Sequence, residues 1–180
     1  CSSDLLGIFG FGKIGSVVAG YGKAFGMNVL AWGRAGSLER AAQAGVTCVQ
    51  SSTELFSRSD VLSVHLRLAP ETRGIIQASD LALMKPTGVF VNTSRAELIA
   101  PGVLAQALQA GRPGFAAVDV YEEEPVRAAN HPLLAIGNVI CTPHLGYVER
   151  DGYELYFGAA FENIAAFAAG QPRSEEHTSE

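Results

Sequence analysis

The chain has 180 residues, a formal net charge of −5 and a hydrophobic fraction of 48%, which suits one globular domain with a substantial core and excludes disorder over most of its length. Its charged residues form no basic block or stripe, which argues against nucleic acids and anionic membranes as partners. Every apolar run is interrupted before the roughly 20 residues that a membrane span requires, so composition favours a small-molecule partner.

A glycine loop follows the first apolar run. Residues 5–9 predict a strand, residues 14–25 predict a helix, and residues 10–15 between them read GFGKIG. In this order, backbone N–H groups and a helix N-terminus approach a pyrophosphate with no side chain in the way. A plain tight turn would give the same glycines, but the flanking strand and helix favour a nucleotide. The predicted cofactor contacts are Gly10, Gly12, Lys13, Ile14 and Gly15.

Short apolar runs and helical patterns alternate along the rest of the chain. Further strands are predicted at 29–32, 47–49, 61–65, 89–92, 115–120 and 139–142, and further helices at 37–44, 52–57, 78–84 and 101–110. Pro101 suits a first helical turn, whereas Gly45 and Gly111 suit the left-handed residue that ends a helix. The alternation predicts an α/β fold: a doubly wound parallel sheet of the Rossmann type, covered on both faces.

The last helical pattern, at residues 147–169, has no strand after it. Its large apolar side chains fall mostly on one face, and they are Tyr153, Tyr156, Phe157, Phe161, Ile164 and Phe167. That face packs either on the chain's own sheet or on a domain that is absent from this chain. Both interpretations stay open at this point.

The second predicted strand lacks the acid that usually ends it. In most dinucleotide folds an Asp or Glu about 20 residues past the glycines accepts a hydrogen bond from the ribose 2′-OH. Here the strand runs into Gly33 and Arg34. Gly33 removes a charge that would repel a 2′-phosphate, and the guanidinium of Arg34 suits one. The pattern indicates NAD(P) with a lean towards NADP, the alternative being a solvated Arg34 and a ribose held by the backbone alone.

Polar side chains follow three later strands, at the sheet edge where ligands bind in open α/β folds. Arg95 follows the strand at 89–92, and Glu124 and His144 come after the next two strands. An Arg, a carboxylate and a His are what reduction of a 2-oxo acid requires. Arg95 would orient the substrate carboxylate, His144 would donate a proton, and Glu124 would hold the imidazole.

These motifs together resemble the NAD-binding domain of the D-isomer-specific 2-hydroxyacid dehydrogenases. The similarity runs over residues 6–172 and includes the glycine loop, SVHL at 63–66, TRG at 72–74, MKP at 84–86, VNTSR at 91–95, DVY at 119–121, EP at 124–125 and TPH at 142–144. By this resemblance Arg95, Glu124 and His144 are the catalytic residues and Asp119 holds the nicotinamide carboxamide. His65 and Thr93 join the cofactor contacts, with Gly33 and Arg34 at the ribose.

The resemblance also implies a layout for the complete protein. Family members place a substrate domain mainly before the glycine loop and return to it with a C-terminal helix. We therefore expect a dinucleotide-binding domain at residues 1–146, a return helix at 147–172, and a homodimer at full length. Ala96 and Arg67 depart from the family's Gly and Pro, and Arg67 is either a second phosphate contact or solvated. Gly33 matches the NADP-preferring glyoxylate and hydroxypyruvate reductases, so a reductase of that type is expected.

Two other functions compete with a hydroxyacid dehydrogenase. A nucleotide-sensing protein-interaction module would share the fold, but the intact set of Arg95, Glu124 and His144 argues against it. Another Rossmann enzyme, such as an amino-acid dehydrogenase, would need a catalytic lysine. The available lysines lie in the loop, the first helix and a turn, where none suits that role: Lys13, Lys23 and Lys85.

The cysteines and the chain ends complete the prediction. Cys1, Cys48 and Cys141 form no CxxC pair, which favours a reducing, cytoplasmic compartment and structural thiols over disulfides or a bound metal. The start at Cys1 lacks a signal-peptide layout, so we expect a cut N-terminus with sequence missing upstream. The apolar-poor tail at 173–180 resembles translated adapter sequence, and its His177 is no site candidate.

Overall fold

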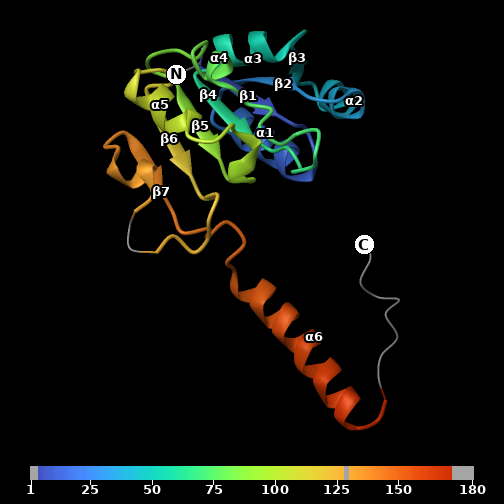
Figure 1. Ribbon diagram of the computed structural model, residues 1–180. Coiled ribbons are helices and arrows are strands. Elements are labelled where there is room, and N and C mark those ends of the chain that lie inside the picture. Colours follow the sequence, from blue (N-terminus) through green and yellow to red (C-terminus); the bar gives the residue numbers. More distant parts are fainter. Residues whose placement is uncertain (1–3, 128–129, 172–180) are drawn as a thin grey trace. The chain divides into compact units, whose positions relative to one another are not determined.

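The computed structural model describes residues 4–127 and 130–171. They fall into two compact units, Cys1–His144 and Leu145–Glu180. The first unit holds a seven-stranded sheet in the order β3-β2-β1-β4-β5-β6-β7, with every strand pair parallel (Figure 1). The predicted doubly wound sheet is thereby confirmed. Its strands are β1 (Leu5–Phe9), β2 (Asn28–Trp32), β3 (Thr47–Cys48), β4 (Val61–Val64), β5 (Val89–Asn92), β6 (Phe115–Val118) and β7 (Val139–Cys141).

Helices connect these strands in the βα order of the prediction. They are α1 (Lys13–Ala24), α2 (Ala35–Gln43), α3 (Ser52–Arg58), α4 (Ala78–Leu81) and α5 (Val103–Gln109), with short 3₁₀ helices η1 (Ala96–Leu98) and η2 (Pro132–Ala135). The left-handed glycines expected at helix ends are confirmed, with φ of +64° at Gly45 and +80° at Gly111.

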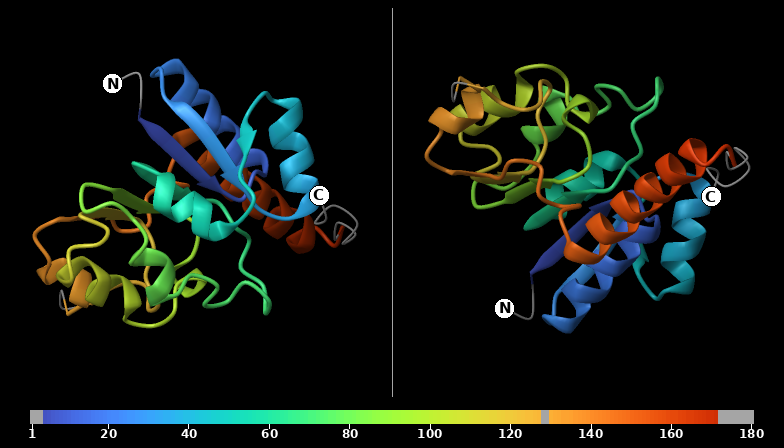
Figure 2. Two further views of the ribbon diagram at one scale, coloured as in Figure 1. Left: turned by 90° about the horizontal axis from the view of Figure 1, so that it is seen from above. Right: turned by 90° about the horizontal axis from the view of Figure 1, so that it is seen from below.

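Alternation along β1 divides the core into two clusters, one on each face of the sheet. Figure 2 shows the helices that lie on the two faces. Leu6 and Ile8 belong to a cluster that includes Ala19 of α1 and Ala41 of α2. Phe9 belongs to the larger cluster of the opposite face, where its ring lies edge-on to Phe56 of α3 at 6.0 Å. Because successive side chains of a strand point to opposite faces, one buried strand supports helices on both sides.

One face of the last three strands is exposed. The register aligns Val91, Ala117 and Ile140 on neighbouring strands, and Phe115 lies two residues before Ala117 on the same face. Phe115 is 51% exposed and Ile140 is 69% exposed. Apolar side chains gathered on an open sheet face form the kind of patch that takes a partner.

Among the predicted boundaries that were wrong, three show a local feature. Pro101 is not in a first helical turn, because Gly102 after it has φ +73° and α5 starts only at Val103. The helix predicted to residue 84 ends at Leu81, before a Lys-Pro pair that disfavours helical backbone. The strand predicted to residue 120 ends at Val118, where the chain turns into the candidate site.

The second unit contains α6 (Arg150–Ala168), the helix expected at 147–169, starting three residues later. It contains no buried residue, and its exposed side chains include Tyr156 at 75% and Phe167 at 76%. Among the described residues, no helix combines the length and the apolar character that a membrane span requires. The tail at 173–180 and Cys1 lie outside the described residues, and the domain boundaries predicted above stay predictions.

Asp60 ties three segments of the first unit together. Its Oδ2 accepts a hydrogen bond from the N–H of Leu5 at 2.9 Å, and its Oδ1 pairs with Nζ of Lys85 at 2.7 Å. Burial raises the pKa of Asp60, but the bonds from Lys85 and Leu5 and the charge of Lys85 outweigh it, so its pKa lies below the ordinary value. The start of β1 is therefore anchored by a carboxylate that stays ionised at neutral pH.

We predict that Asp60→Asn lowers the free energy of unfolding at pH 7 by about 1 kcal/mol, because the amide loses the charge that Lys85 meets. A carboxyl with a depressed folded-state pKa stabilises the protein above its unfolded pKa, and this contribution is lost as the pH falls through the folded pKa. Urea unfolding at pH 7 and pH 3 should therefore show a difference between parent and variant that shrinks in acid. A difference of equal size at both pH values would contradict this role.

Candidate active site

The glycine loop leads from β1 into α1 with an opening at Gly12. Gly10 has φ +97°, and a Cβ there would lie 2.8 Å from the carbonyl oxygen of His65. A Cβ at Gly15 would collide with the carbonyl oxygen of Gly10, whereas a Cβ at Gly12 would meet nothing within 4 Å. The loop is therefore closely packed at its two ends and open in the middle, directly before a helix N-terminus. This arrangement fits a pyrophosphate.

A cavity of about 440 Å³ joins the glycine loop to later strand ends. It is lined by Gly12, Lys13, Ile14, His65, Leu66, Arg67, Leu68, Thr93, Ser94 and Arg95. The structure thus brings five of the predicted cofactor contacts together with Arg95, the predicted substrate-orienting residue. Arg67 lies in the same wall.

His65 enters this cavity as a neutral imidazole. Its Nε2 lies 2.9 Å from Oγ of Ser63. Burial lowers the pKa of His65 to about 4, so the ring carries no charge at neutral pH. His65 therefore contributes a polar but uncharged surface beside the glycine loop.

Glu124 and His144 form the centre of the predicted catalytic set. Oε2 of Glu124 lies 2.5 Å from Nδ1 of His144, and Oε1 accepts a hydrogen bond from the N–H of Tyr121 at 2.9 Å. Burial raises the pKa of Glu124, but the bonds from His144 and Tyr121 and the positive charges of His144 and Arg95 outweigh it, and the pKa is lowered overall. Arg95 is thus close enough to Glu124 to act on its ionisation.

Tyr121 fixes both segments that carry the acid and the histidine. Besides binding Glu124 through its N–H, it donates its hydroxyl to the carbonyl of Thr142 at 2.9 Å. Burial raises the pKa of Tyr121, so this hydroxyl remains a donor. Thr142 in turn donates its Oγ1 to Asp119 at 2.5 Å. His144, two residues after Thr142, has φ +54°. This backbone conformation is uncommon outside glycine, and residues that adopt it cluster at functional sites.

Asn92 fixes the turn that presents Arg95. Its side chain is buried, donates to the carbonyl of Arg95 at 2.9 Å and accepts from the N–H of Ser94 at 3.0 Å. Oγ of Ser94 donates to the carbonyl of Val64 at 2.7 Å. Asn92 and Tyr121 are not among the residues predicted for the site. Their position inside motifs next to Arg95 and Glu124 was the signal that could have found them.

A smaller cavity of about 250 Å³ lies beyond the end of β2, and Gly33 and Arg34 line it. Nη2 of Arg34 pairs with Oε1 of Glu71 at 2.6 Å, and both side chains are well exposed. The backbone N–H of Glu71 and the Arg34 guanidinium lower the pKa of Glu71. Arg34 is therefore not a free surface side chain, because it is paired with Glu71. It would have to leave Glu71 in order to bind a phosphate. Glu71 lies 37 positions from Arg34 and is not among the residues predicted for the site.

Other candidate residues have structural contacts. Nζ of Lys23 donates to the carbonyls of Ala44 and Gly45 at 2.7 and 3.1 Å, and Lys85 pairs with Asp60. Cys48 and Cys141 are free thiols. In the part of the chain that the structure describes, no group of three or more His, Cys, Asp or Glu side chains is placed to hold a metal ion.

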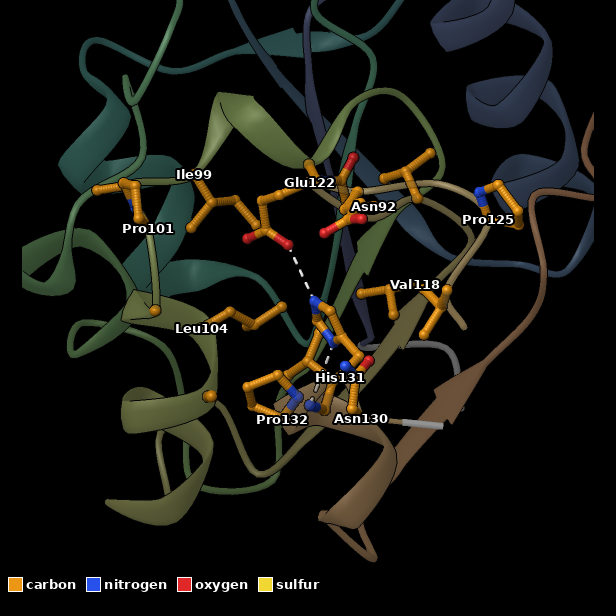
Figure 3. Close-up of a pocket in the computed structure, with 18 of the residues that line it drawn as sticks. Asn92, Ile99, Pro101, Leu104, Val118, Glu122, Pro125, Asn130, His131 and Pro132 are labelled. Atoms are coloured by element: carbon orange, nitrogen blue, oxygen red, sulfur yellow. Dashed lines mark hydrogen bonds and ion pairs between the residues drawn. The ribbon is translucent and has the colours of Figure 1, made fainter. Parts of the chain in front are cut away.

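A third cavity, of about 430 Å³, lies between α5 and the segment that follows β6. Figure 3 shows the His131 imidazole directed at the Glu122 carboxylate, with 2.9 Å between Nε2 and Oε2. The ring of His131 also lies edge-on to Tyr121 at 5.0 Å. The predicted cofactor and catalytic residues do not line this cavity, although Asn92, which holds the turn of Arg95, does.

Comparison with known proteins agrees with this geometry. A family model described as D-isomer specific 2-hydroxyacid dehydrogenase, NAD binding domain, matches residues 2–146. The chain belongs to this family. As a D-isomer specific 2-hydroxyacid dehydrogenase domain, it carries its candidate catalytic residues on the three strand ends that the sequence indicated.

The relatives of this dehydrogenase domain have longer chains. It is 43% identical over 166 residues to the glyoxylate reductase of Aeropyrum pernix, covering 92% of this chain and 49% of that one. It is also 43% identical over 166 residues to the D-3-phosphoglycerate dehydrogenase of Methanocaldococcus jannaschii, and the match covers 92% of this chain and 31% of that protein. The crystal structure of a phosphoglycerate oxidoreductase from Vibrio cholerae has a TM-score of 0.88 at 51% identity, with 93% and 53% covered. The chain thus spans about half of these relatives or less.

We predict that alanine separates the roles of the glycines in this domain. Gly12→Ala should weaken nucleotide binding at least about tenfold while the Tm changes by less than about 2 °C, because its methyl enters the open cradle and touches no protein atom. Gly15→Ala should lower the Tm by more than about 5 °C, because the methyl meets the backbone of Gly10. Thermal unfolding and titration of NADH and NADPH fluorescence measure both effects.

Gly20→Ala is the matched control on the same helix. A Cβ at Gly20 also meets nothing within 4 Å, and alanine in a helix interior is favoured over glycine. This variant should keep the parent's nucleotide affinity with an equal or higher Tm. Unchanged binding by Gly12→Ala would remove the pyrophosphate assignment.

Proposed function

We propose that this chain is the nucleotide-binding part of an oxidoreductase that interconverts a D-2-hydroxy acid and a 2-oxo acid with NAD(P). One observation carries the proposal: Glu124 is hydrogen-bonded to His144, the charge of Arg95 helps to lower the pKa of Glu124, and Arg95 shares a cavity with the open glycine loop. The bound nicotinamide would supply or accept the hydride. Gly10, Gly12, Lys13, Ile14 and Gly15 would hold its pyrophosphate, with His65, Thr93 and Asp119 around the rest of the cofactor.

The chain's own residues would orient the acid and move one proton. Arg95 would bind the substrate carboxylate through its guanidinium fork. Because the Glu124 carboxylate is an acceptor, Nδ1 of His144 carries the proton of that hydrogen bond and Nε2 is the atom that exchanges a proton with the substrate oxygen. In reduction Nε2 would donate its own proton to the carbonyl oxygen, while the proton on Nδ1 stays in the hydrogen bond to Glu124. In oxidation Nε2 would accept the proton of the substrate hydroxyl.

The substrate class we favour is glyoxylate or hydroxypyruvate. The relative named glyoxylate reductase supports it. Gly33 supports it too, because it matches the glyoxylate and hydroxypyruvate reductases that the chain resembles. The same end of β2 supports a lean towards NADP, because Arg34 can meet a 2′-phosphate. A nucleotide-sensing module would bind the cofactor without turnover, so turnover by the complete protein separates the two functions.

The complete protein would contain a substrate domain that this chain lacks. The exposed apolar side chains of α6 and of the β5–β7 face support a further partner surface. A cleft between two domains would exclude water during the reaction, so the chain alone should turn over little substrate. The homodimer and the cytoplasmic location stay predictions.

In the complete protein, His144→Ala should lower kcat on glyoxylate and hydroxypyruvate by about 10²- to 10⁴-fold, because the proton donor is lost. The Kd for the cofactor should stay within about twofold of the parent's, which makes cofactor binding the internal control. Steady-state kinetics together with nucleotide fluorescence titration give both numbers. A variant as active as the parent would show that another group transfers the proton.

For cofactor choice, Arg34→Ala should weaken NADPH binding roughly tenfold and leave NADH binding within about twofold, because a charge-assisted contact to the 2′-phosphate is lost. Arg150→Ala is the control, since Arg150 is likewise an exposed arginine paired with a glutamate, at 3.0 Å on α6. Equal losses for both nucleotides would contradict a role for Arg34 at the 2′-phosphate.

A further inference from the structure

The partner of Arg34 is an acid from a different strand end. Glu71 lies in the segment after β4, and its carboxylate holds Arg34 at 2.6 Å beside the cavity that Gly33, Arg34 and Thr72 line. Thr72 fixes this segment, because its Oγ1 donates to the carbonyl of Arg67 at 2.7 Å and accepts from the N–H of Ala69 at 2.8 Å. The hydrogen bonds of Thr72 therefore fix the turn that places Glu71 beside Arg34.

The end of β2 carries no acid of its own, and a side chain there would be closely packed. A Cβ at Gly33 would lie 3.2 Å from Cβ of Ser37 and 3.6 Å from Cα of Gly10. A side chain at position 33 would thus require a small shift of Ser37 in the first turn of α2. The negative charge beside the predicted ribose position comes instead from Glu71, next to the cationic group that would read a 2′-phosphate.

We propose that Glu71 sets the cofactor preference of this site by competing with a 2′-phosphate for Arg34. The inference rests on the proposed function, since it needs a nucleotide at the glycine loop. With NADH, the Arg34–Glu71 pair remains closed and no charge is displaced. With NADPH, Arg34 leaves Glu71 for the phosphate, so the free energy of the Arg34–Glu71 pair opposes binding.

The competition is close because both partners of the pair are exposed. Ion pairs of this kind are weak and open readily, so Glu71 reduces NADPH binding without preventing it. Glu71 would therefore keep the affinities for the two nucleotides closer together than Arg34 alone would. Removing its charge should release the full selectivity of Arg34.

The test measures Kd for NADPH and NADH by nucleotide fluorescence with the 180-residue chain and its Glu71→Gln variant. Glutamine keeps the shape and removes the charge, so the NADPH Kd should fall about 3- to 10-fold while the NADH Kd stays within about twofold. Glu154→Gln is the matched control, because it neutralises an exposed Arg–Glu pair on α6. It should change neither Kd.

The double variant Arg34→Ala/Glu71→Gln tests the route of the effect. Without Arg34 there is nothing for Glu71 to withhold, so its NADPH Kd should match that of Arg34→Ala within about twofold. If nucleotides bind the parent but Glu71→Gln leaves the ratio of the two Kd values unchanged, the proposal for Glu71 is wrong and the proposed function stands. If the parent binds neither nucleotide, both are wrong.

Discussion

All strands of the sheet run parallel, and this constraint brings the candidate site residues to one edge of the sheet. Their carboxyl ends lie at one edge, so each connection that leaves a strand there can contribute a side chain to the same region. The glycine loop follows β1, Arg34 follows β2, Arg95 follows β5, and Glu124 and His144 follow β6 and β7. Gly12 and Arg95, which are 83 positions apart, thus line one cavity without any long-range feature in the sequence.

The site is polar and partly open, but its supports are buried. Asn92 and Asp119 are 1% and 5% exposed, and both are hydrogen-bonded to segments that carry the candidate catalytic residues. Unpaired buried polar groups are costly, so these contacts favour one arrangement of the loops. Among the described residues, the structure has no buried side-chain nitrogen or oxygen without a hydrogen-bond partner. A scaffold satisfied in this way holds Arg95 and His144 in place before any ligand arrives.

The sequence predicted the sheet and the candidate residues because those features are local. Apolar runs bounded by glycine marked β1 and β5, and strand ends marked Arg95 and His144. Prediction failed where conformation depends on one residue's backbone, as at Gly102, which delays α5 past Pro101. It also failed where a partner is distant in sequence. Arg34 gives no indication of Glu71, because only the packing of the segment after β4 against the end of β2 brings the two together.

The two oxygens of Glu124 meet two donors, the N–H of Tyr121 and Nδ1 of His144. A carboxylate can accept at both atoms, but an amide of the same shape accepts at one and donates at the other. In Glu124→Gln, the Tyr121 N–H would claim the amide oxygen, which turns the NH₂ group towards Nδ1. The neutral imidazole would then carry its proton on Nε2 and offer no lone pair to a substrate hydroxyl. The Glu124 carboxylate therefore determines which nitrogen of His144 carries the proton, and a glutamine of equal size would move that proton from Nδ1 to Nε2.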